Sequence, residues 1–118
     1  MPLRAMHYNR DTNYYEPESL EDLISHLDRA QPQFCLVYLH ASWNPVIKHM
    51  ERDYVKTCGK FGNYMHIKVD CDKHVRIKQY FDTRIEPQFL ILQKGHLMQR
   101  ITGYNFSLIY DFMEKVTE

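Results

Sequence analysis

The spacing of hydrophobic residues changes along this chain, and each change predicts a new element. A first helix is indicated by a serine N-cap and apolar residues at helical intervals: Ser19, Leu20, Leu23, Ile24 and Leu27. This helix should end near Pro32, because the residue before a proline disfavours helical backbone. The almost unbroken apolar run at residues 34–39 then predicts a central strand covered on both faces.

The second half of the chain continues the alternation. Asn44 and Pro45 suit the start of a helix, and residues 65–69 read as a strand. The remaining expected elements are a short helix over 75–81 capped by Asp72, strands at 89–92 and 97–101 joined by a turn at Lys94-Gly95, and a last helix capped by Asn105. The aromatic run at 12–15 predicts an edge strand, so the order is β-α-β-α-β-α-β-β-α.

Composition limits the class of protein. A chain of 118 residues is long enough for one domain with its own core. Fifteen basic and fifteen acidic residues balance, so we expect no nucleic-acid partner, and the absence of a long apolar run predicts no membrane span. We place the domain at residues 12–118, after an N-terminal arm at 1–11. This arm carries Arg4 and Arg10 and no acid before Asp11, which suits a short arm, a segment that orders on a partner, or a mitochondrial import signal.

The cysteines indicate the compartment. Cys35, Cys58 and Cys71 are odd in number and form no Cys-x-x-Cys pair, which is typical of reduced thiols in an intracellular, reducing compartment, mitochondrial or cytoplasmic. Cys35 should be buried in its strand, whereas Cys58 and Cys71 are expected nearer the surface. The histidines are dispersed, so we expect no metal site and no cofactor.

Three segments resemble the thioredoxin-like superfamily, and the resemblance covers nearly the whole chain. They are the strand and turn at residues 36–48, the strand end Lys68-Val69-Asp70-Cys71-Asp72, and Ile85-Glu86-Pro87-Gln88-Phe89, which is similar to the family's Ile-Pro-Thr-Phe. The resemblance implies an α/β thioredoxin-like fold, with a central mixed sheet of four to five strands and helices on both faces. It also implies that the Glu86–Pro87 peptide bond is cis and faces the active-site turn.

The chain departs from the family where the chemistry takes place. Redox-active members carry Trp-Cys-Gly-Pro-Cys-Lys, and this chain carries Trp43-Asn44-Pro45-Val46-Ile47-Lys48. Asn44 and Ile47 therefore occupy the two sulfur positions, and Tyr38 stands where the family has a buried aspartate. Thiol–disulfide exchange requires a thiolate, so the resemblance implies a redox-inactive member that is not an enzyme.

The degenerate active-site turn, Trp43 to Ile47, is expected to serve binding. Asn44 suits an ordinary helix N-cap, and Ile47 should point inward into the space of the missing sulfur. The substrate groove of redox-active relatives would correspond to an exposed apolar cluster here: Trp43, Val46, Ile85 and Pro87. Such clusters usually mark interfaces.

We therefore expect a non-catalytic binding module, a structural or accessory subunit of a larger mitochondrial, ciliary or similar assembly with protein partners. Two alternatives stay open at this point. One is a divergent monothiol oxidoreductase that uses Cys58 or Cys71, and the other is a phosducin-like chaperone cofactor.

Overall fold

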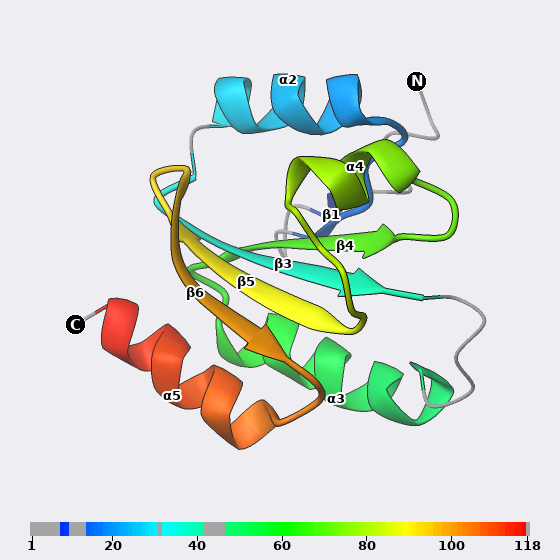
Figure 1. Cartoon of the computed structure of the whole chain (residues 1–118). Coiled ribbons are helices and arrows are strands. Elements are labelled where there is room, and N and C mark those ends of the chain that lie inside the picture. The colour runs from blue at the N-terminus through cyan, green and yellow to red at the C-terminus, as the bar shows by residue number, and fades with distance from the viewer. Residues whose placement is uncertain (1–7, 10–13, 31, 42–46, 118) are drawn as a thin grey trace.

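The computed structural model describes residues 8–9, 14–30, 32–41 and 47–117. Within these ranges the strands form one six-stranded mixed sheet in the order β1-β2-β4-β3-β5-β6 (Figure 1). The strands are β1 Tyr8–Asn9, β2 Tyr14–Tyr15, β3 Phe34–His40, β4 Met65–Asp70, β5 Gln88–Gln93 and β6 His96–Thr102. β3 is parallel to β4 and antiparallel to β5, so the predicted mixed sheet is confirmed.

Helices cover both faces of the sheet, as predicted. Figure 1 shows α2 and α4 on one face and α3 and α5 on the other. Their bounds are α2 Leu20–Ala30, α3 Ile47–Lys60, α4 Val75–Tyr80 and α5 Phe106–Val116. We refer below to the α2/α4 face and the α3/α5 face.

β3 lies at the centre of the core. Because side chains alternate along a strand, Cys35, Val37 and Leu39 join the hydrophobic cluster of the α2/α4 face. Leu36 and Tyr38 join the cluster of the α3/α5 face. The side chains of β3 in both clusters are 2% exposed or less, which confirms the prediction of a strand covered on two sides.

Helix starts were predicted with mixed success. The Asn105 side chain accepts a hydrogen bond from the Leu108 backbone N–H at 3.1 Å, as expected for an N-cap. The predicted cap at Asp72 is wrong, because α4 begins only after His74. The Asp70 carboxylate instead accepts a bond from the Asp72 N–H at 3.0 Å, which holds a turn between β4 and α4.

The edge of the sheet also differs from expectation. β2 is not an edge strand, because Tyr8 pairs antiparallel with Tyr15 and Asn9 with Tyr14. β1 therefore adds an outer strand that comes from the predicted N-terminal arm. The arm's other residues, 1–7, 10 and 11, lie outside the described ranges.

Candidate functional site

The candidate site lies where β3 ends and β5 begins. Gln88 pairs with Leu39, so the residues just before β5 lie beside the carboxyl end of β3. The Glu86–Pro87 peptide bond is cis, as predicted. The Pro87 carbonyl accepts a hydrogen bond from the Gly103 N–H at 3.0 Å, and Gly103 has a φ of +95°, which suits a residue without Cβ. We call residues 85–88 the cis-proline edge.

Two of the predicted groove residues can be placed. The Ile85 side chain is 63% exposed, and Pro87 is half-buried. The predicted partners Trp43 and Val46 lie outside the described residues, as do Asn44 and Pro45. Ile47 opens α3, but its side chain is not described either, so its inward orientation stays a prediction.

An ion pair made by Glu86, the residue before the cis-proline, holds this edge to α4. Glu86 is only 12% exposed in its side chain and forms an ion pair with Lys78 of α4 at 2.8 Å. The hydrogen bond to the Glu86 carboxylate raises the pKa of Lys78, so Lys78 stays protonated at neutral pH. The edge is therefore tied to the scaffold by charge and by backbone hydrogen bonds, while Ile85 stays accessible.

Tyr38 fills the position where the resemblance places a buried aspartate. Its ring is fully buried and stacks on Phe89, with ring centroids 4.6 Å apart and planes 3° apart. The Tyr38 hydroxyl donates to the Tyr104 hydroxyl at 3.2 Å. Burial raises the pKa of Tyr38 well above its ordinary value, so the residue stays neutral at any physiological pH. This position is used for packing and carries no acid.

His40, the last residue of β3, lines a small polar pocket that the sequence did not reveal. The pocket measures roughly 370 Å³ and is lined by Glu16, Pro17, Glu18, His40, Lys68, Asp70, Lys73 and His74. His40 is 6% exposed, and its Nδ1 has no hydrogen-bond partner among the residues that the structure describes. Burial, with a smaller effect from Lys68, lowers the pKa of His40, so its imidazole is neutral at pH 7. Lys68 forms an ion pair with Glu51 of α3.

The structure corrects the expected position of two cysteines. Cys58 and Cys71 are 5% and 3% exposed, so neither lies near the surface. Cys58 packs in the α3/α5 cluster and Cys71 in the α2/α4 cluster. Burial raises the pKa of the Cys58 thiol to about 11 and of the Cys71 thiol to about 12. The periodicity of α3 already contained the signal for Cys58, because it lies one turn after the buried Tyr54.

Cys35 is buried on β3, as predicted, and burial raises the pKa of its thiol as well. All three cysteines are free. Among the described residues, no group of three His, Cys, Asp or Glu side chains is arranged to hold a metal ion. No helix in the described ranges is long and apolar enough to cross a bilayer.

A mixed sheet with helices on both faces and a cis-proline beside the end of its central strand defines a thioredoxin-like domain. The family model described as Thioredoxin matches residues 13–115, so the chain belongs to the thioredoxin family.

Its similarity to individual members is low. It is 27% identical to Thioredoxin H5 of Arabidopsis thaliana over 53% of this chain, a match that spans only about half (53%) of that relative's length. Thioredoxin of Gallus gallus is 25% identical over 74% of this chain and 83% of its own length. The crystal structure of thioredoxin NaTrxh from Nicotiana alata superposes with a TM-score of 0.79 at 22% identity, covering 85% of this chain and 89% of that one.

Proposed function

We propose that this chain is a non-catalytic thioredoxin-family binding module that docks a protein partner at its cis-proline edge, as a subunit of a larger assembly. The observation that carries the proposal is the position of the cysteine sulfur atoms, which lie in the core and not in the turn that corresponds to the family's active site. Residues 42–47 contain no cysteine, and the three cysteines of the chain are all 5% exposed or less. The attacking species in thiol–disulfide exchange is an accessible thiolate.

This burial argues against the monothiol alternative. At pH 7 a thiol with a pKa near 11 is ionised in only about one molecule in 10⁴, and the disulfide of a substrate would also have to reach it. The neutral Tyr38 offers no carboxylate to accept a proton. These features support a role without redox catalysis.

The apolar character of the edge supports docking. Ile85 exposes a large aliphatic side chain directly before the cis peptide bond. The sequence adds Trp43 and Val46 in the adjoining β3–α3 connection. An aromatic residue with aliphatic neighbours is the composition of the energetic centre of many protein interfaces. The free cysteines support a reducing compartment, with the mitochondrial and cytoplasmic locations both open.

The test compares two exposed apolar residues on different surfaces. Ile85 is 63% exposed at the edge, and Val55 of α3 is 60% exposed outside it, so Val55→Asp is a matched control for Ile85→Asp. Tagged full-length chains are purified from the native source, and co-purifying proteins are quantified. We expect Ile85→Asp and the double variant Trp43→Asp/Val46→Asp to lose the stoichiometric partner, while Val55→Asp keeps it.

The opposite result would move the interface elsewhere. If folded Ile85→Asp and Trp43→Asp/Val46→Asp both retain the partner at wild-type yield, the cis-proline edge does not bind it. Insulin reduction with dithiothreitol tests the catalytic half of the proposal, and we expect no acceleration over the blank. Turnover that disappears on replacing Cys58 or Cys71 would establish the monothiol alternative instead.

A further inference from the structure

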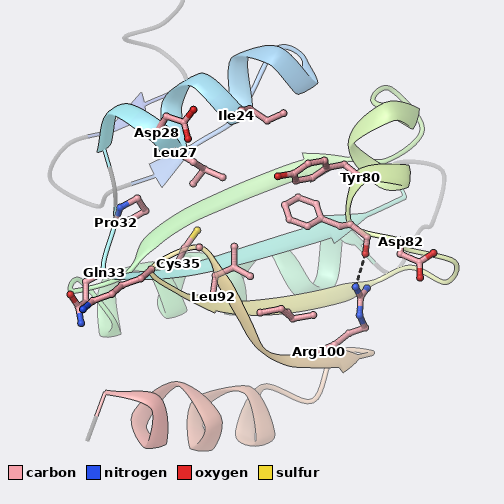
Figure 2. A pocket seen from close by; sticks show the side chains of 14 residues that line it. Ile24, Leu27, Asp28, Pro32, Gln33, Cys35, Tyr80, Asp82, Leu92 and Arg100 are labelled. Carbon is pink, nitrogen blue, oxygen red and sulfur yellow. Dashed lines mark hydrogen bonds between the residues drawn. The ribbon is translucent and has the colours of Figure 1, made fainter.

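A groove opens on the α2/α4 face over the β5–β6 half of the sheet (Figure 2). Its volume is roughly 990 Å³. The sheet forms its floor with Cys35 and Leu92, which are 2% and 5% exposed. Figure 2 shows Ile24 and Leu27 of α2 and Tyr80 of α4 along its walls. Leu97 of β6 lines the groove and is half-exposed, so the groove is open to solvent on that side.

A β-bulge shapes the β6 side of the groove. Ile91 pairs with Gln99, but the next residue, Leu92, pairs with Leu97, so Met98 is an extra residue in β6. Leu97 and Arg100 would lie on opposite faces of a regular strand, since they are three positions apart and side chains alternate with a period of two. Because of the bulge, both line the groove. One strand therefore presents an apolar side chain and a cation to the same cavity.

The charge of Arg100 is not neutralised within the described residues. Its guanidinium donates to two uncharged acceptors, the Gln88 side-chain carbonyl and the Phe81 backbone carbonyl, the second at 2.5 Å. Asp82 also lines the groove, and its carboxylate pairs with Arg84 at 3.5 Å. The other charged lining residues are Asp28, which Figure 2 shows on α2 away from Arg100, and Lys94 in the β5–β6 turn.

The geometry points to a binding site for an elongated apolar molecule with a terminal carboxylate, of the medium-chain fatty-acid class. Arg100 would receive the carboxylate, since a guanidinium has five N–H donors and the described residues accept two hydrogen bonds from it. The planar fork of arginine matches a carboxylate in a bidentate pair. The chain would lie over Leu92 and Leu97 and against Leu27. This site does not depend on the function proposed for the cis-proline edge.

The experiment titrates the full-length chain with sodium dodecanoate below its micellar concentration, by calorimetry and by amide chemical shifts. We expect saturable one-to-one binding, with the largest shifts at Arg100, Leu97 and Leu27. Dodecanol has the same tail without the charge. It should bind more weakly than dodecanoate, and Arg100→Gln should leave dodecanol binding unchanged.

Two variants separate the charge from the apolar wall. Arg100→Gln should weaken dodecanoate at least about 10-fold, the scale of one hydrogen bond to a charged group. Leu97→Asp, at a residue that is 50% exposed, should weaken both dodecanoate and dodecanol, and dodecanoate more because the new carboxylate also repels its charge. Val55→Asp should change neither. Circular dichroism checks that each variant folds. If Arg100→Gln unfolds, Leu97→Asp still tests the site, because Leu97 is half-exposed and its replacement should leave the fold intact.

Three results would overturn the inference. The first is no saturable binding of dodecanoate to the folded wild-type chain. The second is unchanged dodecanoate affinity in Leu97→Asp, or in folded Arg100→Gln. The third is tighter binding of an apolar hexapeptide with a free C-terminal carboxylate, which would assign the groove to a chain terminus of a protein in place of a small molecule.

Discussion

Replacing Tyr38 with alanine tests whether the position of the missing acid has become a packing anchor. The Tyr38 side chain is fully buried, and its ring lies 4.6 Å from Phe89 and 4.8 Å from Tyr54. A buried aromatic side chain covers about 150–250 Å², which corresponds to roughly 4–6 kcal/mol at about 25 cal/mol per Å². Comparable aromatic-to-alanine substitutions cost about 3–5 kcal/mol. We therefore expect Tyr38→Ala to lower the free energy of unfolding by about 4 kcal/mol.

The measurement is urea unfolding followed by circular dichroism. A chain of this size has a total stability of about 6–18 kcal/mol, so the variant should fold but with a much reduced margin. At an m-value near 2 kcal/mol per M, the midpoint should fall by about 2 M. Tyr38→Phe is the matched control, because it keeps the ring and removes only the hydrogen bond to Tyr104. That bond is worth about 1 kcal/mol.

Two outcomes would refute the reasoning. A loss below about 1 kcal/mol in Tyr38→Ala would mean that the cluster repacks around the gap and that Tyr38 is not an anchor. A Tyr38→Phe variant as unstable as Tyr38→Ala would mean that the hydroxyl, not the ring, carries the effect. A double-mutant cycle with Tyr104→Phe then separates the hydrogen bond from the packing.

Two further predictions follow from burial of titratable groups. Burial raises the pKa of the Cys58 thiol from 9.0 to about 11, so the thiolate fraction at neutral pH falls about 100-fold. Ellman's reagent should therefore label Cys58 more slowly in the folded chain than in guanidinium, by at least this factor. Labelling of native Cys58 or Cys71 at the rate of the unfolded chain would contradict the burial of these thiols. Burial lowers the pKa of His40 and of His66, so the folded chain holds both neutral and the stability they contribute is present above the unfolded value near 6.5. The free energy of unfolding should therefore fall as the pH drops below about 6.5, and the double variant His40→Gln/His66→Gln should flatten this pH dependence. If the double variant keeps the slope of the wild type, groups other than these two histidines take up the protons on unfolding.

The fold was readable from the sequence because its strongest signals are local. The run at β3 and the periodicity of α2 and α5 gave elements close to those observed. β1 could not be predicted, because a two-residue strand exists only through its pairing with Tyr14 and Tyr15. The start of α4 was missed for a related reason, since Asp70 and Asp72 both have cap-forming side chains and only the three-dimensional turn chooses between them.

The candidate site was partly readable. The cis-proline position followed from its resemblance to a known segment, and Ile85 was correctly expected to be exposed. The burial of Cys71 was missed, because the sequence pattern does not show whether a residue just past the end of a strand faces the core or the solvent. The groove on the α2/α4 face could not be predicted from the sequence. The bulge that brings Leu97 and Arg100 to the same face depends on the register between β5 and β6.

The contacts that hold the cis-proline edge explain how it can keep its shape without redox chemistry. Pro87 is fixed by the Gly103 N–H, Glu86 by Lys78, and Gln88 by Arg100 and by its pairing with Leu39. None of these partners is a sulfur atom. The interactions that hold the edge and leave Ile85 exposed therefore do not depend on active-site cysteines. An edge held in this way can keep its shape in the non-catalytic binding role that we propose, and this is why the proposal places the partner there.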